Sequence, residues 1–385
     1  MTDTATSLVA ENPIFAISER VTILRAAGVD VISLAVGEPE VPTADIVLEA
    51  AVAAVRDRAT HHYGTSAGIV GLREEVASRH PGIDPSQVQV AVGTKHALHL
   101  ALAAVAGPGD DVLVVQPSWP GHLASVTSVG AATKPVPVGR DGLVDVAALC
   151  GARTPCTRAV VLANPSNPTG ALHPPERVRE IARWCLDHDA WLVSDEVYGG
   201  LVFDGDHASA LQTVPDTSRL LVVDGVSKVH AMTGWRVGWL IGTPEVVASA
   251  RQEVSATITH VPLVTQYAAL AALQDPETPV RAVADYRVAR DLLVDRLRSI
   301  PGVLCPPPAG GMFAFPDVSG LLATGRWRDT IELAAWLLDH ALVAVVPGAV
   351  FGADEHLRIS FAIGYERLAA AAGRVVRALT TTEEP

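Results

Sequence analysis

The sequence predicts an α/β fold, with a large domain built on a mainly parallel central sheet sandwiched by helices and a smaller α+β domain. Between residues 88 and 241, short apolar runs typical of buried strands alternate with runs of helical periodicity. Such alternation favours a parallel sheet. After Pro279 a long helical pattern continues to about Ile300, where Pro301-Gly302 ends it. This pattern suits a helix that leads into a second domain.

The first part of the chain supplies a polar arm and then elements of both kinds. A helical pattern at Ile17, Val21 and Leu24 ends at Gly28, and the strand-like stretch VISLAV follows it. Helices are expected over residues 44–58 and 72–80, on either side of a turn-rich loop at 61–68. The domains expected from these patterns are an arm plus the first segment of the small domain (1–43), the large domain (44–280), and the connecting helix plus the C-terminal small domain (281–385).

The large domain is expected to contain six buried strands. The apolar runs place them at residues 88–92, 111–115, 159–163, 190–194, 220–224 and 237–241, with helices at 96–105, 121–129 and 174–187. Further strands are expected in the small domain at 311–315, 343–346 and 357–361. Because ligands bind beyond the carboxyl ends of parallel strands, the loops that follow these strands are the expected functional loops.

Composition limits the classes of function. The chain has 385 residues, of which 49% are hydrophobic, so it can bury a large core. Its 29 basic and 42 acidic side chains give a net charge of −13 without a basic block, which argues against binding to nucleic acid or to an anionic membrane. The longest uncharged run, residues 112–133, contains two prolines and two glycines and suits a strand, a loop and a helix better than a membrane span.

The four cysteines indicate neither a metal site nor a disulfide framework. They form no CxxC pair and show no ligand-like spacing with histidine. The amino terminus has no basic region followed by an apolar one, so no secretion signal is expected. A reduced, cytoplasmic location without a bound metal is therefore predicted.

The stretch DGVSKVHAMTGWRVG, residues 224–238, combines a lysine and an arginine with many small residues. Lys228 is flanked by Gly225 and Ser227, and Arg236 follows eight residues later in a G-W-R-V-G context. One interpretation is an amine held in a confined pocket beside a fixed anion clamp. The alternative is an exposed lysine in a glycine-containing turn before a strand.

Three further loops follow predicted strands. Gly93-Thr94-Lys95 precedes a helix, where free backbone N–H groups and the helix dipole favour an anion. The loop NPSNPTG begins at Asn164, and the segment SDEVY runs from Ser194 to Tyr198. Taken singly, these segments are ordinary turns or caps.

Together with Lys228 and Arg236, these motifs resemble in residue type and order the fold-type-I pyridoxal-phosphate enzymes, specifically the class I/II aminotransferases. The likeness extends from VISLAVGEP to LRISFA and is strongest to the bacterial aspartate aminotransferase subgroup. It implies a pyridoxal 5'-phosphate enzyme that moves an amino group from an L-amino acid to a 2-oxo acid, through an aldimine at Lys228 and pyridoxamine phosphate. The alternatives are a lyase, cyclase or oxidase on the same fold, or a non-catalytic regulator, which the lack of a basic helix-turn-helix segment disfavours.

The resemblance assigns roles around the cofactor ring. Lys228 would bind the cofactor and move a proton between the substrate Cα and the cofactor carbon, which requires a partly deprotonated amine. Asp195 would pair with the pyridinium nitrogen. Asn167 and Tyr198 would hydrogen-bond the phenolic oxygen, and Trp119 would stack on the ring.

The resemblance also implies how the phosphate is held and how the enzyme assembles. Gly93, Thr94 and Arg236 would bind the phosphate, a role that suits a helix start and a fork of donors. Tyr63 matches the tyrosine that reaches the phosphate in the neighbouring subunit. The implied assembly is therefore a homodimer with shared active sites.

Substrate binding is assigned in the same way. Arg358, in the segment HLRISF, matches the arginine that clamps the substrate α-carboxylate, and Gly37 matches a main-chain contact to it; Asn167 also lies at this site. Lys95 matches the lysine that recognises a distal carboxylate, so the resemblance implies an acidic substrate such as aspartate or glutamate. The alternative for Lys95 is a solvated lysine in the first turn of a helix.

Some residues depart from the pattern of the relatives. Gly225 stands where many of them carry a phosphate-binding serine. His96, His122 and His230 stand where the subgroup has other residues, as do Ser118 and Pro120. A single histidine is most often a satisfied polar residue, whereas three near one cofactor could alter the substrate.

Overall fold

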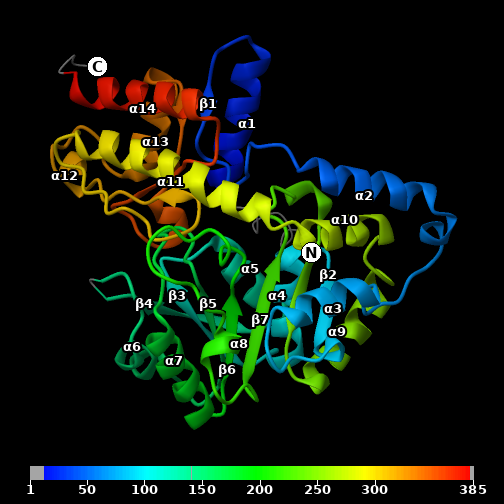
Figure 1. Cartoon of the computed structure of the whole chain (residues 1–385). Helices are drawn as coiled ribbons and strands as arrows, with labels where there is room; N and C mark the ends of the chain where they lie inside the picture. Colours follow the sequence, from blue (N-terminus) through cyan, green and yellow to red (C-terminus); the bar gives the residue numbers. More distant parts are fainter. Residues whose placement is uncertain (1–12, 140, 382–385) are drawn as a thin grey trace, which may run out of the picture. The chain divides into compact units, whose positions relative to one another are not determined.

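The computed structural model describes residues 13–139 and 141–381 (Figure 1). The chain forms two compact units. The large unit comprises Val41–Asp285 and Ala309–Gly311, and the small unit comprises the described residues up to Glu40, Tyr286–Pro308 and the described residues from Met312 onwards. The domain boundaries expected at residues 43/44 and 280/281 stay a prediction.

The large unit is built on a seven-stranded sheet. Its strands lie in the order β2-β8-β7-β6-β5-β3-β4. β8 pairs antiparallel with both of its neighbours, and the four remaining strand pairs are parallel, which confirms the predicted mainly parallel sheet. In sheet order, the strands are Val88–Ala91, Gly238–Ile241, Leu220–Gly225, Trp191–Asp195, Thr157–Ala163, Asp111–Gln116 and Ala132–Pro137.

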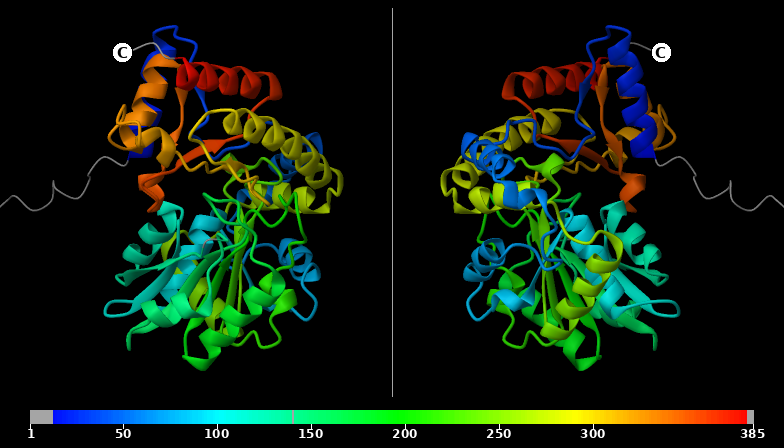
Figure 2. Two further views of the ribbon diagram at one scale, coloured as in Figure 1. Left: turned by 90° about the vertical axis from the view of Figure 1, so that its left-hand side faces the viewer. Right: turned by 90° about the vertical axis from the view of Figure 1, so that its right-hand side faces the viewer.

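Helices cover both faces of this sheet, as the side views show (Figure 2). Alternate residues of a strand point to opposite faces, so Leu113 packs into one core while Val112 and Val114 pack into the other. The first core is closed by α2 (Asp45–Arg56), α3 (Val70–Ser78), α7 (Pro175–Asp187) and α10 (Leu263–Gln274). The second is closed by α4 (Gly93–Val105), α5 (Pro120–Ser128) and α9 (Pro244–Thr257).

The small unit contains two short sheets and several helices. β1 (Ile32–Ser33) pairs parallel with β10 (Val343–Ala344). β12 (Leu357–Ser360) lies between β11 (Val346–Pro347) and β9 (Phe313–Ala314) and is antiparallel to both. The helices that belong to it are α1 (Pro13–Ala26), α12 (Ser319–Leu322), α13 (Thr330–His340), α14 (Tyr365–Thr380) and the part of α11 (Glu277–Arg298) that follows Asp285.

The structure differs from the predicted elements in a few places. α4 begins at Gly93 instead of residue 96, so Gly93, Thr94 and Lys95 form its first turn. The edge strand β4 and the helices α6 (Val146–Ala152), α9 and α10 have no predicted counterpart. β4 reads ATKPVP, and its lysine and two prolines hide the strand pattern because an edge strand tolerates both residue types.

The described residues contain neither a helix that could span a membrane nor a cluster that could hold a metal ion. No helix within residues 13–139 and 141–381 is long and apolar enough to cross a membrane. Over the same ranges, no group of three or more His, Cys, Asp or Glu side chains is arranged to hold a metal ion. The four cysteines are free thiols.

Candidate active site

Three neighbouring strands of the large unit end at the same edge of the sheet. β5, β6 and β7 are parallel and in register, with Ala163 beside Asp195 and Asp195 beside Val223. The loop from Asn164, the segment from Asp195 to Tyr198 and the segment that carries Lys228 therefore lie next to one another. This edge brings together the loops that the sequence analysis singled out.

Asp195 is buried and held by a histidine from another helix. His122, on α5, lies with its Nε2 2.9 Å from Asp195 Oδ2, and its Nδ1 lies 2.9 Å from Ser118 Oγ. Because a carboxylate only accepts, Nε2 carries the hydrogen. The backbone N–H of Val197 donates to Asp195 Oδ1 at 3.2 Å. Both carboxylate oxygens therefore have a fixed partner, which sets the orientation of the group.

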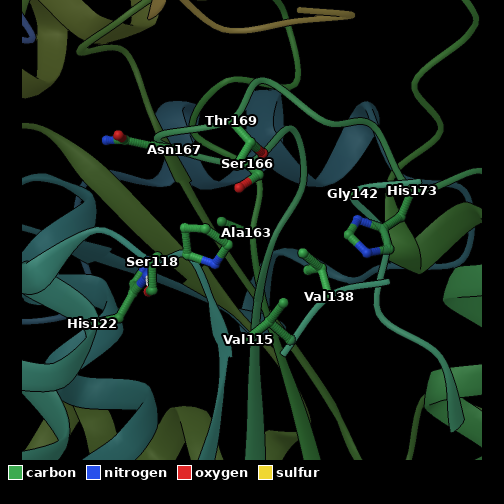
Figure 3. Close-up of a pocket in the computed structure, with 11 residues that line it drawn as sticks. Val115, Ser118, His122, Val138, Gly142, Ala163, Ser166, Asn167, Thr169 and His173 are labelled. Atoms are coloured by element: carbon green, nitrogen blue, oxygen red, sulfur yellow. Dashed lines mark hydrogen bonds between the residues drawn. The ribbon is translucent and has the colours of Figure 1, made fainter. Parts of the chain in front are cut away.

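A small polar cavity lies beside this pair (Figure 3). Ser118 and His122 line one side of it and His173 the other. Its volume of about 10 Å³ is room for about one water molecule. His173 Nε2 accepts the N–H of Val144 at 3.0 Å, and burial lowers the pKa of His173 to about 4. His173 is thus a neutral acceptor that fixes the loop around Val144.

Asn167, Tyr198 and Lys228 come from three different loops and lie close together. The amide Nδ2 of Asn167 donates to the hydroxyl of Tyr198 at 3.5 Å, and both side chains are buried. The amine Nζ of half-buried Lys228 lies 6.0 Å from the centre of the Tyr198 ring. An amine, a phenol and an amide are thereby gathered beside the Asp195 loop.

An arginine lies against the first turn of α4. Arg236 adopts a left-handed backbone conformation with φ of 57°. Its Nη1 donates to Thr233 O at 2.8 Å and its Nη2 to Val92 O at 3.3 Å. Gly93 has φ of 75°, and a Cβ built on it would lie 2.4 Å from Arg236 Nη2. Glycine is therefore favoured at position 93 by the backbone conformation, and a side chain there would displace the Arg236 guanidinium.

Thr94 is surrounded by glycines. A Cβ at Gly225 would lie 2.8 Å from Thr94 Oγ1, and one at Gly238 would lie 2.6 Å from the Thr94 backbone nitrogen. The Thr94 hydroxyl is buried and has no hydrogen-bond partner in the protein. A buried donor at the start of a 13-residue helix, with an exposed arginine beside it, fits an anion such as a phosphate.

Lys95 and Trp119 flank the same region. The Lys95 amine lies 5.7 Å from the centre of the Trp119 ring, and Trp119 meets His122 edge to face with ring centres 5.4 Å apart. Tyr63 lies on a loop of the large unit and is 86% exposed. Its ring meets that of His260 edge to face. Such exposure of a tyrosine leaves most of its surface available to another chain.

Gly37 and Arg358 belong to the small unit. Arg358 lies on β12 and is 4% exposed, and its Nη2 donates to the carbonyl of Ala35 at 2.7 Å. Gly37 packs against Phe313, because a Cβ built on it would lie 2.8 Å from the end of that ring. The guanidinium of Arg358 and the backbone at Gly37 therefore share the neighbourhood of Ala35 and Phe313.

The three unusual histidines have different surroundings. His122 contacts Asp195, as described above. His96 Nδ1 accepts the N–H of Val92 at 3.1 Å, and burial lowers its pKa, which keeps this acceptor neutral. His230 is buried, and burial lowers its pKa to about 4. His122 thus contacts a predicted site residue, and His96 fulfils the ordinary role of capping a backbone N–H.

Sequence reasoning did not foresee the bond between His122 and Asp195. The two residues are 73 positions apart in the sequence. The one signal was the segment PSWPGH, in which Ser118 and His122 stand four residues apart near a strand end. Ser118 lies just before α5 and His122 lies in its first turn, and this arrangement places the two side chains within hydrogen-bond distance.

A lysine, an aspartate and an anion site at one edge of such a sheet are the features of a pyridoxal-phosphate-dependent transferase. The family model described as aminotransferase class I and II matches residues 29–375, so the chain belongs to that family. The aspartate aminotransferase of Streptomyces avermitilis is 38% identical over 98% of this chain and 96% of its own. The arginine–pyruvate transaminase of Pseudomonas aeruginosa is 35% identical over 90% of each chain. The structure of Thermus thermophilus aspartate aminotransferase with maleate matches with a TM-score of 0.89, at 34% identity over 95% and 96% of the two chains.

Proposed function

We propose that this aminotransferase moves the amino group of an acidic L-amino acid, such as aspartate or glutamate, to a 2-oxo acid at the edge formed by β5, β6 and β7. The observation that carries the proposal is the gathering of Lys228, Asp195 and Tyr198 beside the anion pocket at Thr94. When bound, pyridoxal phosphate supplies an electron sink for the bond that breaks at the substrate Cα.

Lys228 is proposed as the proton carrier. Its amine is the group that would hold pyridoxal phosphate when no substrate is present. The amine of Lys228 would then be the base that takes the proton from the substrate Cα and the acid that gives it back. Tyr198, whose ring centre lies 6.0 Å from the lysine amine, and Asn167, which donates to the Tyr198 hydroxyl, would hydrogen-bond the phenolic oxygen of the cofactor.

Asp195 is proposed to accept a hydrogen bond from the pyridinium nitrogen, with His122 as a positioning residue behind it. The bond from His122 Nε2 and the bond from the Val197 N–H hold the carboxylate in one orientation. A fixed, buried carboxylate favours the protonated ring nitrogen, which strengthens the electron sink. Trp119, edge-on to His122, is proposed to stack on the ring.

The phosphate is proposed to bind at the start of α4. The Thr94 hydroxyl, the first N–H groups of the helix and Arg236 would supply its donors. The contact that Arg236 makes with Thr233 O fixes the guanidinium before the anion arrives. The glycines around Thr94 leave the room that this anion requires.

Replacing Gly225 with serine should weaken cofactor binding. The new Cβ would lie 2.8 Å from Thr94 Oγ1 and from Val237 O, and backbone atoms cannot move away easily. Overpacking costs about 1–3 kcal/mol, so the dissociation constant of pyridoxal phosphate should rise about 5- to 100-fold. Titration of the apoprotein with pyridoxal phosphate measures this dissociation constant. Gly234→Ser is the control, since a Cβ on Gly234 meets no atom within 4 Å. Equal or tighter binding by the Gly225→Ser variant would contradict this account of the pocket.

The substrate carboxylates are proposed to bind at two places. Arg358 and the Gly37 backbone would hold the α-carboxylate, because a guanidinium fork matches a carboxylate bidentately. Lys95, exposed and beside Trp119, would hold the distal carboxylate. The aspartate aminotransferases among the relatives support an acidic substrate. A steady-state assay of the loaded enzyme with 2-oxo acids and a panel of L-amino acids tests this, and a preference for a basic or neutral donor would refute it.

Replacing Lys95 with alanine should raise KM for aspartate and leave KM for alanine unchanged. A hydrogen bond to a charged group contributes about 1.5–3 kcal/mol, so the KM for aspartate should rise about 10- to 100-fold. Steady-state kinetics with both donors measure the effect. A similar loss for both donors would assign Lys95 to the fold or the cofactor instead of the distal carboxylate.

A homodimer with shared active sites is also part of the proposal. On α2, large apolar side chains at Ile46, Val52 and Val55 are about half exposed, and Tyr267 on the adjacent α10 is 40% exposed. A group of this kind favours burial against another chain, and Tyr63 would reach the partner's phosphate. Sedimentation equilibrium should give twice the chain mass, and a monomer at micromolar concentration would contradict the proposal.

A cytoplasmic location stays a prediction.

A further inference from the structure

We propose that Phe313 and Phe351 form an aromatic clamp that positions the Arg358 guanidinium and stabilises its charge for the binding of a carboxylate. The two rings are positioning residues in this proposal. The inference rests on the proposed function only in taking Arg358 as the group that binds the substrate α-carboxylate.

The geometry of the clamp is defined by two rings from different segments of the small unit. The central carbon Cζ of Arg358 lies 4.2 Å from the centre of the Phe313 ring and 4.8 Å from the centre of the Phe351 ring. Phe313 belongs to β9, which pairs with β12, and Phe351 ends the short helical turn Gly348–Phe351. All three side chains are buried. A guanidinium within 6 Å of a ring face is attracted by the ring quadrupole, and desolvation strengthens that attraction.

The two ring contacts affect how Arg358 can bind a carboxylate. Arg358 Cζ lies over the faces of both rings, where the ring quadrupole attracts the cation. This attraction stabilises the buried charge without the exchange of a hydrogen bond. The bond from Nη2 to Ala35 O then fixes the rotation of the plane.

Phe313 couples the arginine to the backbone at Gly37. The end of its ring occupies the space where a Cβ on residue 37 would lie, at 2.8 Å. The same ring therefore sets the distance between the Gly37 backbone and the Arg358 guanidinium. Both groups that are proposed to bind the α-carboxylate are positioned by one aromatic side chain.

Phe351 is itself supported by an aromatic stack. Phe315 meets Phe351 edge to face with ring centres 6.0 Å apart, and His356 stacks on Phe315 at 4.7 Å. Burial lowers the pKa of His356, so this imidazole stays neutral near neutral pH. The stack thus holds Phe351 in place and adds no second cation near Arg358.

Stepwise fluorination of the rings tests the clamp, because fluorine weakens the ring quadrupole with little change in shape. Phe351 is replaced in the full-length enzyme by mono-, di- and trifluorophenylalanine, and the same series is made at Phe313. We expect KM for aspartate to rise with each fluorine, to about tenfold or more in the trifluoro variants, while kcat changes less than about twofold. KM is expected to change more than kcat because Arg358, which the clamp positions, binds the α-carboxylate, and this carboxylate does not itself react.

The control is the same fluorinated series at Phe315, which shares the aromatic core but contacts Phe351 and His356. KM should stay constant along this series. A flat KM at Phe351 and Phe313, or an equal rise at Phe315, would overturn the proposal and leave packing as the role of the rings. If a trifluoro variant fails to fold, the monofluoro variants still show whether KM for aspartate rises with fluorination. An unmodified protein that transfers no amino group would refute the proposed function instead.

Discussion

Replacing Lys228 with alanine should abolish amino transfer, with a fall in kcat of at least about 10⁴-fold. Lys228 is proposed both to hold the cofactor and to move the proton at the substrate Cα, and a general acid–base group alone contributes about 10²–10⁴ in rate. Steady-state kinetics with aspartate and a 2-oxo acid measure the loss. Because Asp195, Thr94 and Arg236 remain, the variant should still bind pyridoxal phosphate, although more weakly.

The chain offers a precise control for this variant. It contains three lysines, Lys95, Lys134 and Lys228. Lys134 lies on the edge strand β4 near Asp111, so Lys134→Ala should keep wild-type kinetics. Borohydride reduction followed by peptide mass spectrometry should place the cofactor on Lys228 in the wild type. Attachment at Lys95 or Lys134, or full activity of Lys228→Ala, would show that the proton carrier has been assigned wrongly.

Replacing Asp195 with asparagine should lower kcat about 10³-fold while leaving the fold intact. Breaking a buried, hydrogen-bonded charge pair costs about 3–5 kcal/mol, and here that loss falls on the interaction with the pyridinium nitrogen. Asparagine keeps the shape of the side chain but removes the negative charge that favours the protonated ring. Single-turnover kinetics with aspartate measure the rate of amino transfer to the cofactor directly.

Glu196 is the matched control for Asp195. It is the next residue in the chain and is also buried, but it accepts from Ser194 Oγ at 2.9 Å and from the Ala210 N–H at 2.8 Å. Burial raises the pKa of Glu196, so glutamine resembles its protonated form. Glu196→Gln should therefore keep kcat within a fewfold of wild type. Equal losses in the two variants would mean that any buried carboxylate at this sheet edge matters, irrespective of the cofactor.

Much of the fold followed from local pattern. The apolar runs of β5, β6 and β7 are buried on both faces, and such strands give continuous apolar stretches that a sequence displays directly. The edge strand β4 was missed because Lys134 and Pro135 are compatible with an edge and interrupt the pattern. The start of α4 was placed three residues late because Gly93 and Thr94 are poor helix formers that serve here as its first turn.

The site was predictable as a set of loops but not as a set of contacts. The order of the motifs identified Lys228, Asp195 and Asn167, since each follows a strand end. The bond between His122 and Asp195 joins two elements, and so does the contact between Gly225 and Thr94. The rings over Arg358 come from two segments other than its own. Contacts of this kind depend on packing, which periodicity and local motifs do not encode.

A single half-reaction tests the central claim most directly. The pyridoxal-phosphate-loaded enzyme is mixed with L-aspartate in the absence of any 2-oxo acid, and absorbance, oxo acid and ammonia are followed together. The proposed function predicts that the cofactor passes fully to its pyridoxamine form, with one oxo acid released per site and no ammonia. Release of ammonia while the cofactor stays in its pyridoxal form would contradict amino transfer and indicate a lyase.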